Sequence, residues 1–518
     1  MIVLSSYVSG AWKKGEGAAQ VLVNPATEEP LAETSTRGLD LAAALAFARD
    51  KGGPALRSMS FAERGELLRS MSRIIHQHRD HLLDVAMESG GVTRSDAKFD
   101  VDGAMGTLAH YADLGKDLGG RKWLADGDAV QLGRSPRFVG HHLLLPRRGV
   151  AVHVNAFNFP AWGFGEKAAC ALLAGMPVFV KPATSTALLA HRLFELIVEA
   201  KVLPEGVASL LTGPAGDLIE HLQGEDVLSF TGGGSTATTL RSSAAIVRDS
   251  VRVNVEADSL NAAILGVDVE PGSDTYGAFL RDVFRDMTQK TGQKCTAIRR
   301  VFVPRDRAAG VVEELVERLR GVVTGNPKTD GVTMGPVATA AQARDVKAGL
   351  DLLRAESRVA FGDGPFEPVG SPPGKGFFVP PTLFVQESPA AAKAAHAHEV
   401  FGPAATVFAY DSTEEAIGQV RRGGGGLVSS IYSDDKALST DLVLGIGSSH
   451  GRVVALSAKV VDQAPGPGTV LPQTIHGGPG RAGGGEELGG LRGLGFYSQR
   501  VAVQGDRPFI DSLSGAKG

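Results

Sequence analysis

The sequence has very few cysteines for its length. Only Cys170 and Cys295 occur among 518 residues, which excludes a fold held together by a framework of disulfide bonds. Cys170 lies in an apolar, alanine-rich run typical of a core helix, whereas Cys295 lies in the loop Gly292-Gln293-Lys294-Cys295-Thr296. We therefore interpret Cys170 as a core residue, and Cys295 either as a small buried side chain or as a reactive thiol.

Long apolar runs and long runs of one charge are also missing. No apolar stretch reaches the roughly 18 residues that a membrane-spanning helix needs, and Met1 to Ser6 do not resemble a secretory signal. The formal net charge is −4, from 53 basic and 57 acidic residues without clusters. We expect a cytoplasmic protein of two or three domains, with neither nucleic acid nor membrane as a partner.

Two regions of the chain alternate between strand and helix patterns. The first begins near Gly149, with strands predicted at 150–155, 177–181, 207–211, 227–230 and 251–255 and helices at 163–174 and 185–200. The second runs from about Asn261 to Tyr432. This alternation predicts an α/β fold with a parallel, doubly wound sheet, which binds its ligands at the carboxyl ends of the strands. The residues that follow these ends are Asn155–Asn158, Lys181–Thr184, Thr231–Ser235 and Glu256.

Three other segments have distinct patterns. The segment from Trp123 to Pro146 is predicted to be extended and to form a projecting hairpin. The segment from Ala464 to Gly495 is rich in glycine and proline and too long for an ordinary connection, so it is either functional or mobile. A last strand around Val501–Val503 precedes a polar tail.

Several of these residues have side chains suited to catalysis. Lys294 is a cation next to Cys295, so we expect it to lower the pKa of the thiol. Asn158 can donate a hydrogen bond to an oxyanion, although an asparagine before Phe-Pro is also a common turn residue. Partial burial is expected to raise the pKa of Glu256 toward that of a useful base, the alternative being a solvated acid. The glycine loop after Thr231 fits a phosphate or is an ordinary turn.

Together with Lys181 and the run Glu399-Val400-Phe401-Gly402-Pro403, these motifs occur in the order and approximate spacing of the aldehyde dehydrogenase superfamily. The chain resembles that superfamily over nearly its whole length. The resemblance implies a Rossmann-like cofactor-binding domain at 1–124 and 149–258, and an α/β catalytic domain at 259–481. It also implies a small β oligomerisation arm at 125–148, joined by the C-terminal segment 482–518, and hence a homodimer or a dimer of dimers.

The resemblance also implies roles for five catalytic residues. Cys295 would attack the aldehyde, and Asn158 with the Cys295 backbone N–H would hold the oxyanion. Glu256 would activate the water that hydrolyses the resulting thioester. Lys167 and Glu487 match a buried lysine and a late glutamate of a proton relay, although an ordinary helix-end lysine and a loop acid would look the same in the sequence.

A nicotinamide cofactor is implied as well, and no metal. Thr184 stands where members that prefer NAD often carry a ribose-binding glutamate, so we expect NADP to be preferred and NAD to be the weaker cofactor. The cofactor-binding residues implied by the motifs are Lys181, Ala183, Thr184, Thr231, Gly232, Gly233, Ser235, Glu399 and Phe401.

The chain departs from the usual family pattern after its glutamate. The usual Glu-Leu-Gly-Gly-Lys is replaced here by Glu256-Ala257-Asp258-Ser259-Leu260. The glutamate is kept but the glycine turn after it is lost, so the sequence does not establish whether Glu256 reaches Cys295. The aromatic side chains near Asn158 are expected to line an aldehyde tunnel or to belong to the core. These side chains are Phe157, Phe159, Trp162 and Phe164.

The glycine-rich stretch from Ile475 to Arg492 is unlike most aldehyde dehydrogenases. It is similar to the semialdehyde dehydrogenases of aerobic benzoate degradation and phenylacetate ring cleavage, which implies a CoA-linked substrate, 3,4-dehydroadipyl-CoA semialdehyde. The alternatives are a general aliphatic aldehyde, a CoA-acylating semialdehyde dehydrogenase, and a non-enzymatic binding protein that keeps the fold.

Overall fold

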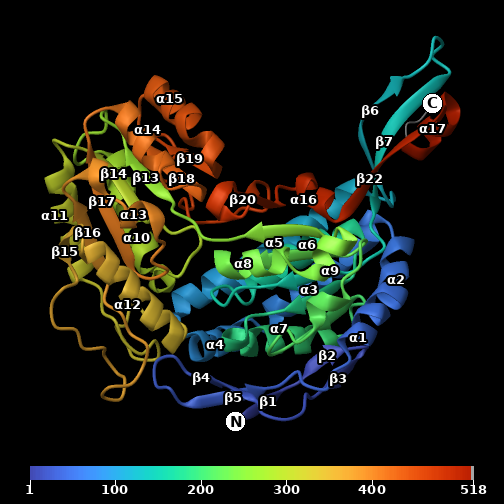
Figure 1. Cartoon of the computed structure of the whole chain (residues 1–518), viewed down its shortest axis with the longest axis horizontal. Helices are drawn as coiled ribbons and strands as arrows, with labels where there is room; N and C mark the ends of the chain where they lie inside the picture. The colour runs from blue at the N-terminus through green and yellow to red at the C-terminus, as the bar shows by residue number, and fades with distance from the viewer. Residues whose placement is uncertain (515–518) are drawn as a thin grey trace.

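The computed structural model describes residues 1–514, which form two seven-stranded sheets with helices on both faces of each (Figure 1). Five neighbouring strands of the first sheet are parallel, and two N-terminal strands extend it in antiparallel fashion. In spatial order the strands are β12 (Arg252–Glu256), β11 (Val227–Thr231), β8 (Ala151–Val154), β9 (Val178–Lys181), β10 (Ala208–Leu210), β2 (Ser6–Val8) and β3 (Ala11–Lys13).

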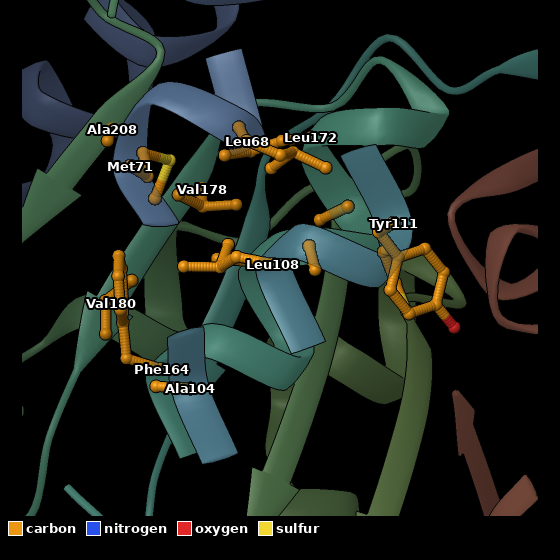
Figure 2. Close-up of a cluster of buried hydrophobic side chains, with 14 of the residues drawn as sticks. Leu68, Met71, Ala104, Leu108, Tyr111, Phe164, Leu172, Val178, Val180 and Ala208 are labelled. Atoms are coloured by element: carbon orange, nitrogen blue, oxygen red, sulfur yellow. The ribbon is translucent and has the colours of Figure 1, made fainter. Parts of the chain in front are cut away.

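Alternation along these short strands explains why both faces are covered. Val178 and Val180 on β9 belong to one hydrophobic cluster, and Phe179 between them belongs to the opposite one, because successive side chains of a strand point to opposite faces. The larger cluster is drawn in Figure 2. Its helices are α2 (Gly53–Ser58), α3 (Phe61–Gln77), α4 (Arg79–Gly90), α5 (Arg94–Leu118), α6 (Trp162–Ala174) and α7 (Ala187–Glu199). On the other face lie α1 (Leu41–Phe47) and α9 (Ala244–Asp249).

Helix α6 packs unusually close to α5. A Cβ atom at Gly165 would lie 3.0 Å from the Ala104 Cα atom, so only a glycine allows this approach without a shift. Asp100 on α5 accepts a hydrogen bond from the Trp162 backbone N–H at 2.7 Å and thereby satisfies a free donor at the start of α6. The two contacts fix the helix that carries Glu166 and Lys167.

The second sheet is parallel except for one edge strand. Its strands in order are β15 (Arg358–Phe361), β16 (Thr382–Gln386), β17 (Ala404–Tyr410), β14 (Arg300–Pro304), β13 (Ala262–Leu265), β18 (Gly426–Tyr432) and β19 (His450–Leu456). One face is covered by α10 (Asp274–Thr288) and α11 (Ala308–Arg320). The other is covered by α12 (Ala340–Arg354), α13 (Ala394–Ala397), α14 (Thr413–Arg421) and α15 (Lys436–Ile446).

A three-stranded arm projects from the body at the upper right of Figure 1. It consists of β6 (Leu124–Gln131) and β7 (Phe138–Pro146), with β22 (Ser498–Asp506) paired along the whole of β7. The polar tail expected after the last strand is instead the helix α17 (Arg507–Ser514). Its Ile510 is buried, and Trp123 donates a hydrogen bond to the Leu513 carbonyl at 2.8 Å, so the tail packs on the arm.

Two smaller sheets complete the structure. One joins β1 (Ile2–Leu4), β5 (Pro30–Thr34) and β4 (Gln20–Val23). The other pairs β20 (Ile475–Gly478) with β21 (Gly485–Leu488), and α16 (Leu491–Phe496) follows it. The glycine- and proline-rich segment is therefore folded, and its β21 strand packs against α6 and β12.

The predicted α/β architecture is confirmed, and within residues 1–514 the strands and helices of the first alternating region occur where the sequence pattern placed them. None of the helices in this part of the chain combines the length and the apolar character needed to span a lipid bilayer.

Candidate active site

The loop that carries Cys295 lies between α10 and β14 and faces the carboxyl ends of the first sheet. Lys290, Thr291 and Gly292 all have left-handed backbone conformations, with φ of 52°, 56° and 67°. A Cβ atom at Gly292 would lie 2.1 Å from the Gly402 carbonyl oxygen, so this position needs glycine. The tight turn brings Cys295 to the side of the first sheet where β8, β11 and β12 end.

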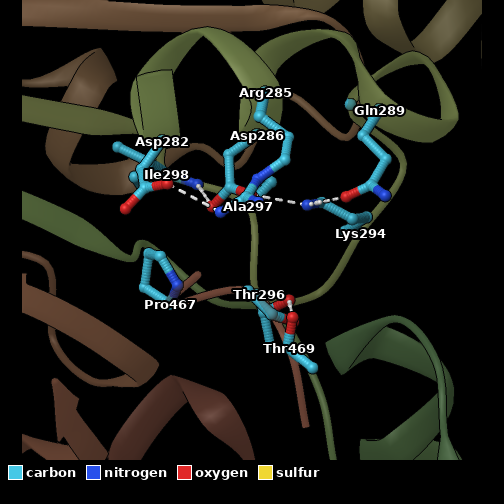
Figure 3. Close-up of polar contacts among 12 residues, drawn as sticks. Asp282, Arg285, Asp286, Gln289, Lys294, Thr296, Ala297, Ile298, Pro467 and Thr469 are labelled. Carbon is cyan, nitrogen blue, oxygen red and sulfur yellow. Dashed lines mark hydrogen bonds and ion pairs between the residues drawn. The ribbon is translucent and has the colours of Figure 1, made fainter. Parts of the chain in front are cut away.

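Lys294 does not face Cys295, contrary to our expectation. Its ammonium group binds Asp286 at 2.5 Å and the Gln289 side chain at 2.9 Å, both on the α10 side of the loop (Figure 3). The pair with Asp286 is fully buried, and Asp286 also accepts the Ile298 backbone N–H at 3.3 Å. Lys294 therefore anchors the loop to α10 and does not activate the thiol.

The Cys295 thiol has a pKa well above its ordinary value. Burial is the main cause, and the negative charge of the nearby Glu256 carboxylate adds to it. The expectation of a lowered thiol pKa is therefore wrong, because the neighbouring cation is engaged elsewhere and carboxylates surround the sulfur instead. Cys295 needs a base before it can act as a nucleophile.

Glu256, at the end of β12, reaches the thiol despite the altered residues that follow it. A Glu256 carboxylate oxygen, the Cys295 sulfur and a ring nitrogen of His476 all lie within 4.8 Å of one another. Two hydrogen bonds fix the backbone beyond Glu256: the Ala257 N–H donates to the Ala482 carbonyl, and Asp258 accepts the Gly234 N–H. These bonds hold the strand end without the usual glycine turn.

The pKa of Glu256 is lowered, not raised as expected. Burial alone would raise it, but the charge of His476 and the hydrogen bond from its ring outweigh burial, with Lys167 adding to the effect. The His476 Nε2 atom lies 3.1 Å from Glu256 Oε2 and 4.0 Å from the Cys295 sulfur. This histidine lies on β20 in the glycine-rich segment and was not among the predicted site residues.

Behind Glu256 lies a buried network of carboxylates around Lys167. The Lys167 ammonium group binds Glu487 at 3.2 Å and Glu166 at 3.1 Å. Glu487 also accepts hydrogen bonds from Ser229 at 2.6 Å and Asn254 at 3.0 Å. Burial raises the pKa of Glu166 to about 7, against the opposing charge of Lys167. Glu166 was not singled out from the sequence, although it precedes Lys167 directly.

Asn158 lies on the other side of the thiol, just after β8. Its side-chain nitrogen donates to the Gln293 carbonyl at 3.0 Å, in the same loop as Cys295. A carboxamide has two N–H donors, so one remains for a group bound beside the sulfur. The loop and the strand end are thus tied together at the position where an oxyanion would form.

Two cavities meet at Cys295, and Asn158, Thr231 and Glu256 line both. The smaller one is mostly aromatic and apolar. It is lined by Phe99, Ala156, Phe159, Trp162, Gly163, Glu166, Thr296, Gly468, Val470 and His476. Among the four aromatic side chains expected near an aldehyde, Phe159 and Trp162 line this cavity, Phe157 lines the larger one, and Phe164 is in the core.

The larger cavity is lined by eight of the nine residues predicted to bind a cofactor. They are Lys181, Ala183, Thr184, Thr231, Gly232, Gly233, Glu399 and Phe401. The ninth, Ser235, is exposed on α8 (Gly234–Arg241), and its neighbour Thr236 lines the wall instead.

Two charged residues of this cavity, Glu399 and Lys181, have pKa values shifted by burial. Glu399 accepts the Ser259 backbone N–H at 2.8 Å and faces Arg299 at 3.5 Å, and burial raises its pKa to about 7. Burial lowers the pKa of Lys181 to about 8. The Phe401 ring packs edge-on against Phe157, with centroids 5.8 Å apart.

Comparison with known proteins gives a family for this arrangement. Residues 12–464 match the model of the aldehyde dehydrogenase family. The chain belongs to the aldehyde dehydrogenase family. It is 45% identical over 477 residues to a 3,4-dehydroadipyl-CoA semialdehyde dehydrogenase from Aromatoleum evansii, covering 92% of this chain and 93% of that protein. It is 30% identical to aldehyde dehydrogenase 1A1 from Bos taurus, over 85% of each chain.

Solved structures share the fold of this aldehyde dehydrogenase at lower identity. Lactaldehyde dehydrogenase from Escherichia coli superposes with a TM-score of 0.84 at 24% identity, covering 97% of this chain and 99% of that one. The NAD⁺ complex of an aldehyde dehydrogenase from Bacillus cereus gives a TM-score of 0.84 at 22% identity, covering 97% and 96%.

In this aldehyde dehydrogenase the structure brings all five predicted catalytic residues into one buried region. Cys295, Glu256 and Asn158 surround the junction of the two cavities, and Lys167 and Glu487 lie behind Glu256. The additional groups are His476, Glu166 and the Phe99 ring. Glu166 had a signal in its position next to Lys167, whereas His476 and Phe99 reach the site only through packing between different segments of the chain.

Proposed function

We propose that the protein oxidises a CoA-linked semialdehyde, 3,4-dehydroadipyl-CoA semialdehyde, to the corresponding acid with NADP as the preferred cofactor. The observation that carries this proposal is the 45% identity with the Aromatoleum evansii enzyme over nearly the whole of both chains. Aerobic benzoate degradation is the pathway that this substrate implies. The thiol, the base and the oxyanion donor at the junction of two cavities support aldehyde oxidation itself.

In this proposal the reaction has two halves: oxidation of the aldehyde to a thioester on Cys295, and hydrolysis of that thioester. The Cys295 thiol loses its proton to Glu256, and the thiolate attacks the aldehyde carbon from the smaller cavity. Asn158 donates to the oxyanion, a contact typically worth about 3 kcal/mol in the barrier. The nicotinamide cofactor, when bound, accepts the hydride. Glu256 then releases the proton of the thiol to solvent and, ionised again, takes a proton from water, whose oxygen attacks the thioester carbon, and Cys295 leaves as a thiolate.

The larger cavity fits a dinucleotide by its lining. It runs from Lys181 and Thr184 to Cys295, and the buried Thr231 hydroxyl that lines it has no hydrogen-bond partner within residues 1–514. Lys181 and Thr184 would hold the phosphate and ribose of the adenosine part, and Glu399 and Phe401 the nicotinamide part. The glycines after Thr231 allow a close approach to the diphosphate.

Replacing Thr184 by glutamate is expected to reverse the cofactor preference. A carboxylate at this position would repel the 2′-phosphate of NADP and accept the free 2′-hydroxyl of NAD. The ratio of kcat/KM for NADP to kcat/KM for NAD should fall at least about tenfold, which corresponds to about 1.4 kcal/mol. The matched control, Thr184→Gln, has the same length without the charge and should change the ratio less. A wild-type enzyme that prefers NAD would contradict the proposed preference.

The substrate proposal is tested by comparing two aldehydes of equal chain length with NADP. For a six-carbon CoA-linked semialdehyde, kcat/KM should exceed that for the free semialdehyde acid by about 100-fold or more, because binding energy from the remote CoA part lowers the barrier. Equal values would leave a general aliphatic aldehyde as the substrate.

Two rival functions can be distinguished by the product: a CoA-acylating dehydrogenase forms an acyl-CoA, and a non-enzymatic binding protein forms no product. A CoA-acylating dehydrogenase releases its thioester to CoA and has no need of a water-activating carboxylate, so the ionised Glu256 beside the thiol speaks against it. A non-enzymatic binding protein would need neither the nucleophile nor the oxyanion donor, and both are present. Formation of the free acid as the only product would exclude both rivals.

We also propose that the predicted domain division holds and that the arm joins subunits into a homodimer or a dimer of dimers. Support comes from apolar side chains exposed on the arm and on its packed helix α17. These side chains are Val130, Leu132, Phe138 and Phe509. The cytoplasmic location and the absence of nucleic-acid and membrane partners stay predictions.

A further inference from the structure

His476 lies on a strand that is held by neighbours on both sides. It lies on β20, opposite Glu487 of β21 in the antiparallel pair, and β20 also packs against β18 and β19 of the second sheet. Close backbone approaches fix its strand: a Cβ atom at Gly477 would lie 2.0 Å from the Gly485 carbonyl oxygen. The ring is only 3% exposed and lines the smaller cavity beside Cys295.

The two oxygens of Glu256 have different surroundings. Oε2 lies 3.1 Å from His476 Nε2, whereas Oε1 is buried and has no hydrogen-bond partner in the part of the chain that the structure describes. A carboxylate held at one oxygen keeps the other free to accept a proton. Because the thiol sulfur lies within 4.8 Å of the carboxylate, the free oxygen belongs to the reacting end of the site.

The charges around the imidazole favour its protonated form. Burial alone would lower the pKa of His476, but the charge of Glu256 and the hydrogen bond with it outweigh burial and raise the pKa. Glu166 acts in the same direction, and Arg452 opposes it. The titratable and charged groups that face the ring or its strand are Glu256 on β12, Cys295 before β14, Glu166 and Lys167 on α6, Arg452 on β19, and Glu487 on β21.

The other cations of the site are engaged elsewhere within residues 1–514. Lys167 binds Glu166 and Glu487, and Lys294 binds Asp286. Arg452 donates to two backbone carbonyls, those of Thr469 at 2.6 Å and Pro467 at 2.9 Å. His476 is therefore the cationic side chain that directly contacts the Glu256 carboxylate.

We propose that His476 is a positioning residue for the base: its imidazolium binds Oε2 of Glu256, keeps the buried carboxylate ionised, and leaves Oε1 free for the proton. Proton transfer then has a simple balance. The S–H bond of Cys295, or an O–H bond of water, breaks, its proton forms an O–H bond at Oε1, and the electron pair stays on sulfur or on the water oxygen. The imidazolium keeps its own proton throughout. This inference rests on the proposed roles of Cys295 and Glu256.

The role proposed for His476 determines the pH range in which the enzyme is active. An ionised Glu256 is needed for base catalysis, so the acidic limb of the pH–rate profile follows its ionisation. With the imidazolium present, Glu256 stays ionised to lower pH. Without it, the effect of burial is opposed mainly by the charge of Lys167, and the limb moves to higher pH. Loss of a cation in direct contact shifts a carboxyl pKa by about 1–3 units.

The test uses His476→Gln in the full chain, because the glutamine amide can still donate a hydrogen bond to Oε2 but carries no charge. The rate of p-nitrophenyl acetate hydrolysis at saturating ester, measured from about pH 4 to about 10 without nucleotide or aldehyde, reports thiol acylation and water-dependent deacylation. Because the pKa of Glu256 in the wild type is lowered, its acidic limb lies at or below the lower end of this range. We expect the limb of the variant to lie about 1–3 pH units higher, so that its rate falls within the measured range and recovers at high pH.

The matched control is His450→Gln. His450 is also a buried imidazole, on the neighbouring strand β19, but it bonds to the Ile446 carbonyl at 3.0 Å. Its replacement should leave the limb where it is. His476→Asn is a second uncharged variant in case the glutamine does not fold, and it should shift the limb in the same direction.

An acidic limb that stays in place in both His476 variants would overturn the inference, as would a rate lowered equally at every pH, which is the signature of a merely structural loss. The ester assay needs neither the semialdehyde nor NADP. A wrong substrate or cofactor assignment would therefore appear as absent aldehyde oxidation, while the shift of the limb would still uphold the role of His476.

Discussion

Replacing Cys295 by alanine is expected to abolish aldehyde oxidation, with a loss of at least about 10⁴-fold in kcat, because the only thiol at the junction of the two cavities in residues 1–514 is removed. Folding should be preserved, since the sulfur faces cavities and not a packed core. The measurement is cofactor reduction at saturating aldehyde, with cofactor binding and cooperative thermal unfolding as the checks on structure.

Cys170→Ala is the matched control for Cys295→Ala. Cys170 is fully enclosed in the core on α6, where burial raises its pKa to about 12, so it cannot replace the nucleophile. Its replacement should reduce stability modestly, through a small cavity, and leave kcat within a few-fold. Turnover by Cys295→Ala at a rate near that of the wild type would remove Cys295 from the mechanism.

Replacing Glu256 by glutamine is expected to slow steady-state turnover by about 10²- to 10⁴-fold and the first-turnover burst much less. The carboxylate is the second-largest cause of the raised pKa of the Cys295 thiol, so a neutral amide lets the thiol lose its proton to solvent more easily. Water has no such route, because its pKa is far higher, and deacylation therefore becomes limiting.

Rapid mixing distinguishes the two phases for Glu256→Gln. A burst of one equivalent of reduced cofactor, followed by a slow steady state, is the expected trace. Equal losses in both phases would assign Glu256 to activation of the thiol alone. Glu486→Gln is a suitable control, because Glu486 is an exposed acid next to the buried Glu487 and should leave both phases unchanged.

The sequence predicted the elements of this fold because its patterns are local. The strands that end at Lys181, Thr231 and Glu256 are apolar runs bounded by turn residues, and they occur where those runs do. The residues after each end line the larger cavity, as expected for a parallel sheet. Family resemblance added the order of the motifs, from which five catalytic residues were named.

The protonation states could not be predicted, because they depend on which distant groups meet. The neighbour of Cys295 in the sequence, Lys294, turns away to Asp286, while Glu256 and His476, distant along the chain, surround the sulfur. The expected pKa directions of both Cys295 and Glu256 were therefore wrong. Glycine-rich segments have no periodicity, so the strand that carries His476 could not be recognised either.

For the position of Glu256, in contrast, the structure removed a doubt that the sequence had raised. The missing glycine turn after Glu256 cast doubt on its position, but the contacts of Ala257 and Asp258 replace that turn. Both contacts are made outside the motif: Ala482 is more than 200 residues away in the sequence, and Gly234 is the first residue of α8. A local comparison with the family motif could not reveal them.

The position of β20, β21 and β22 near the end of the chain has a consequence for biosynthesis. His476 and Glu487 reach the site only with these late strands, and β22 closes the arm on β7, more than 350 residues earlier in the chain. A nascent chain that still lacks them exposes its thiol beside an incomplete set of acids and bases. A chain that stops before β20 therefore lacks both His476 and Glu487 beside Glu256, and it also lacks the strand that pairs with β7.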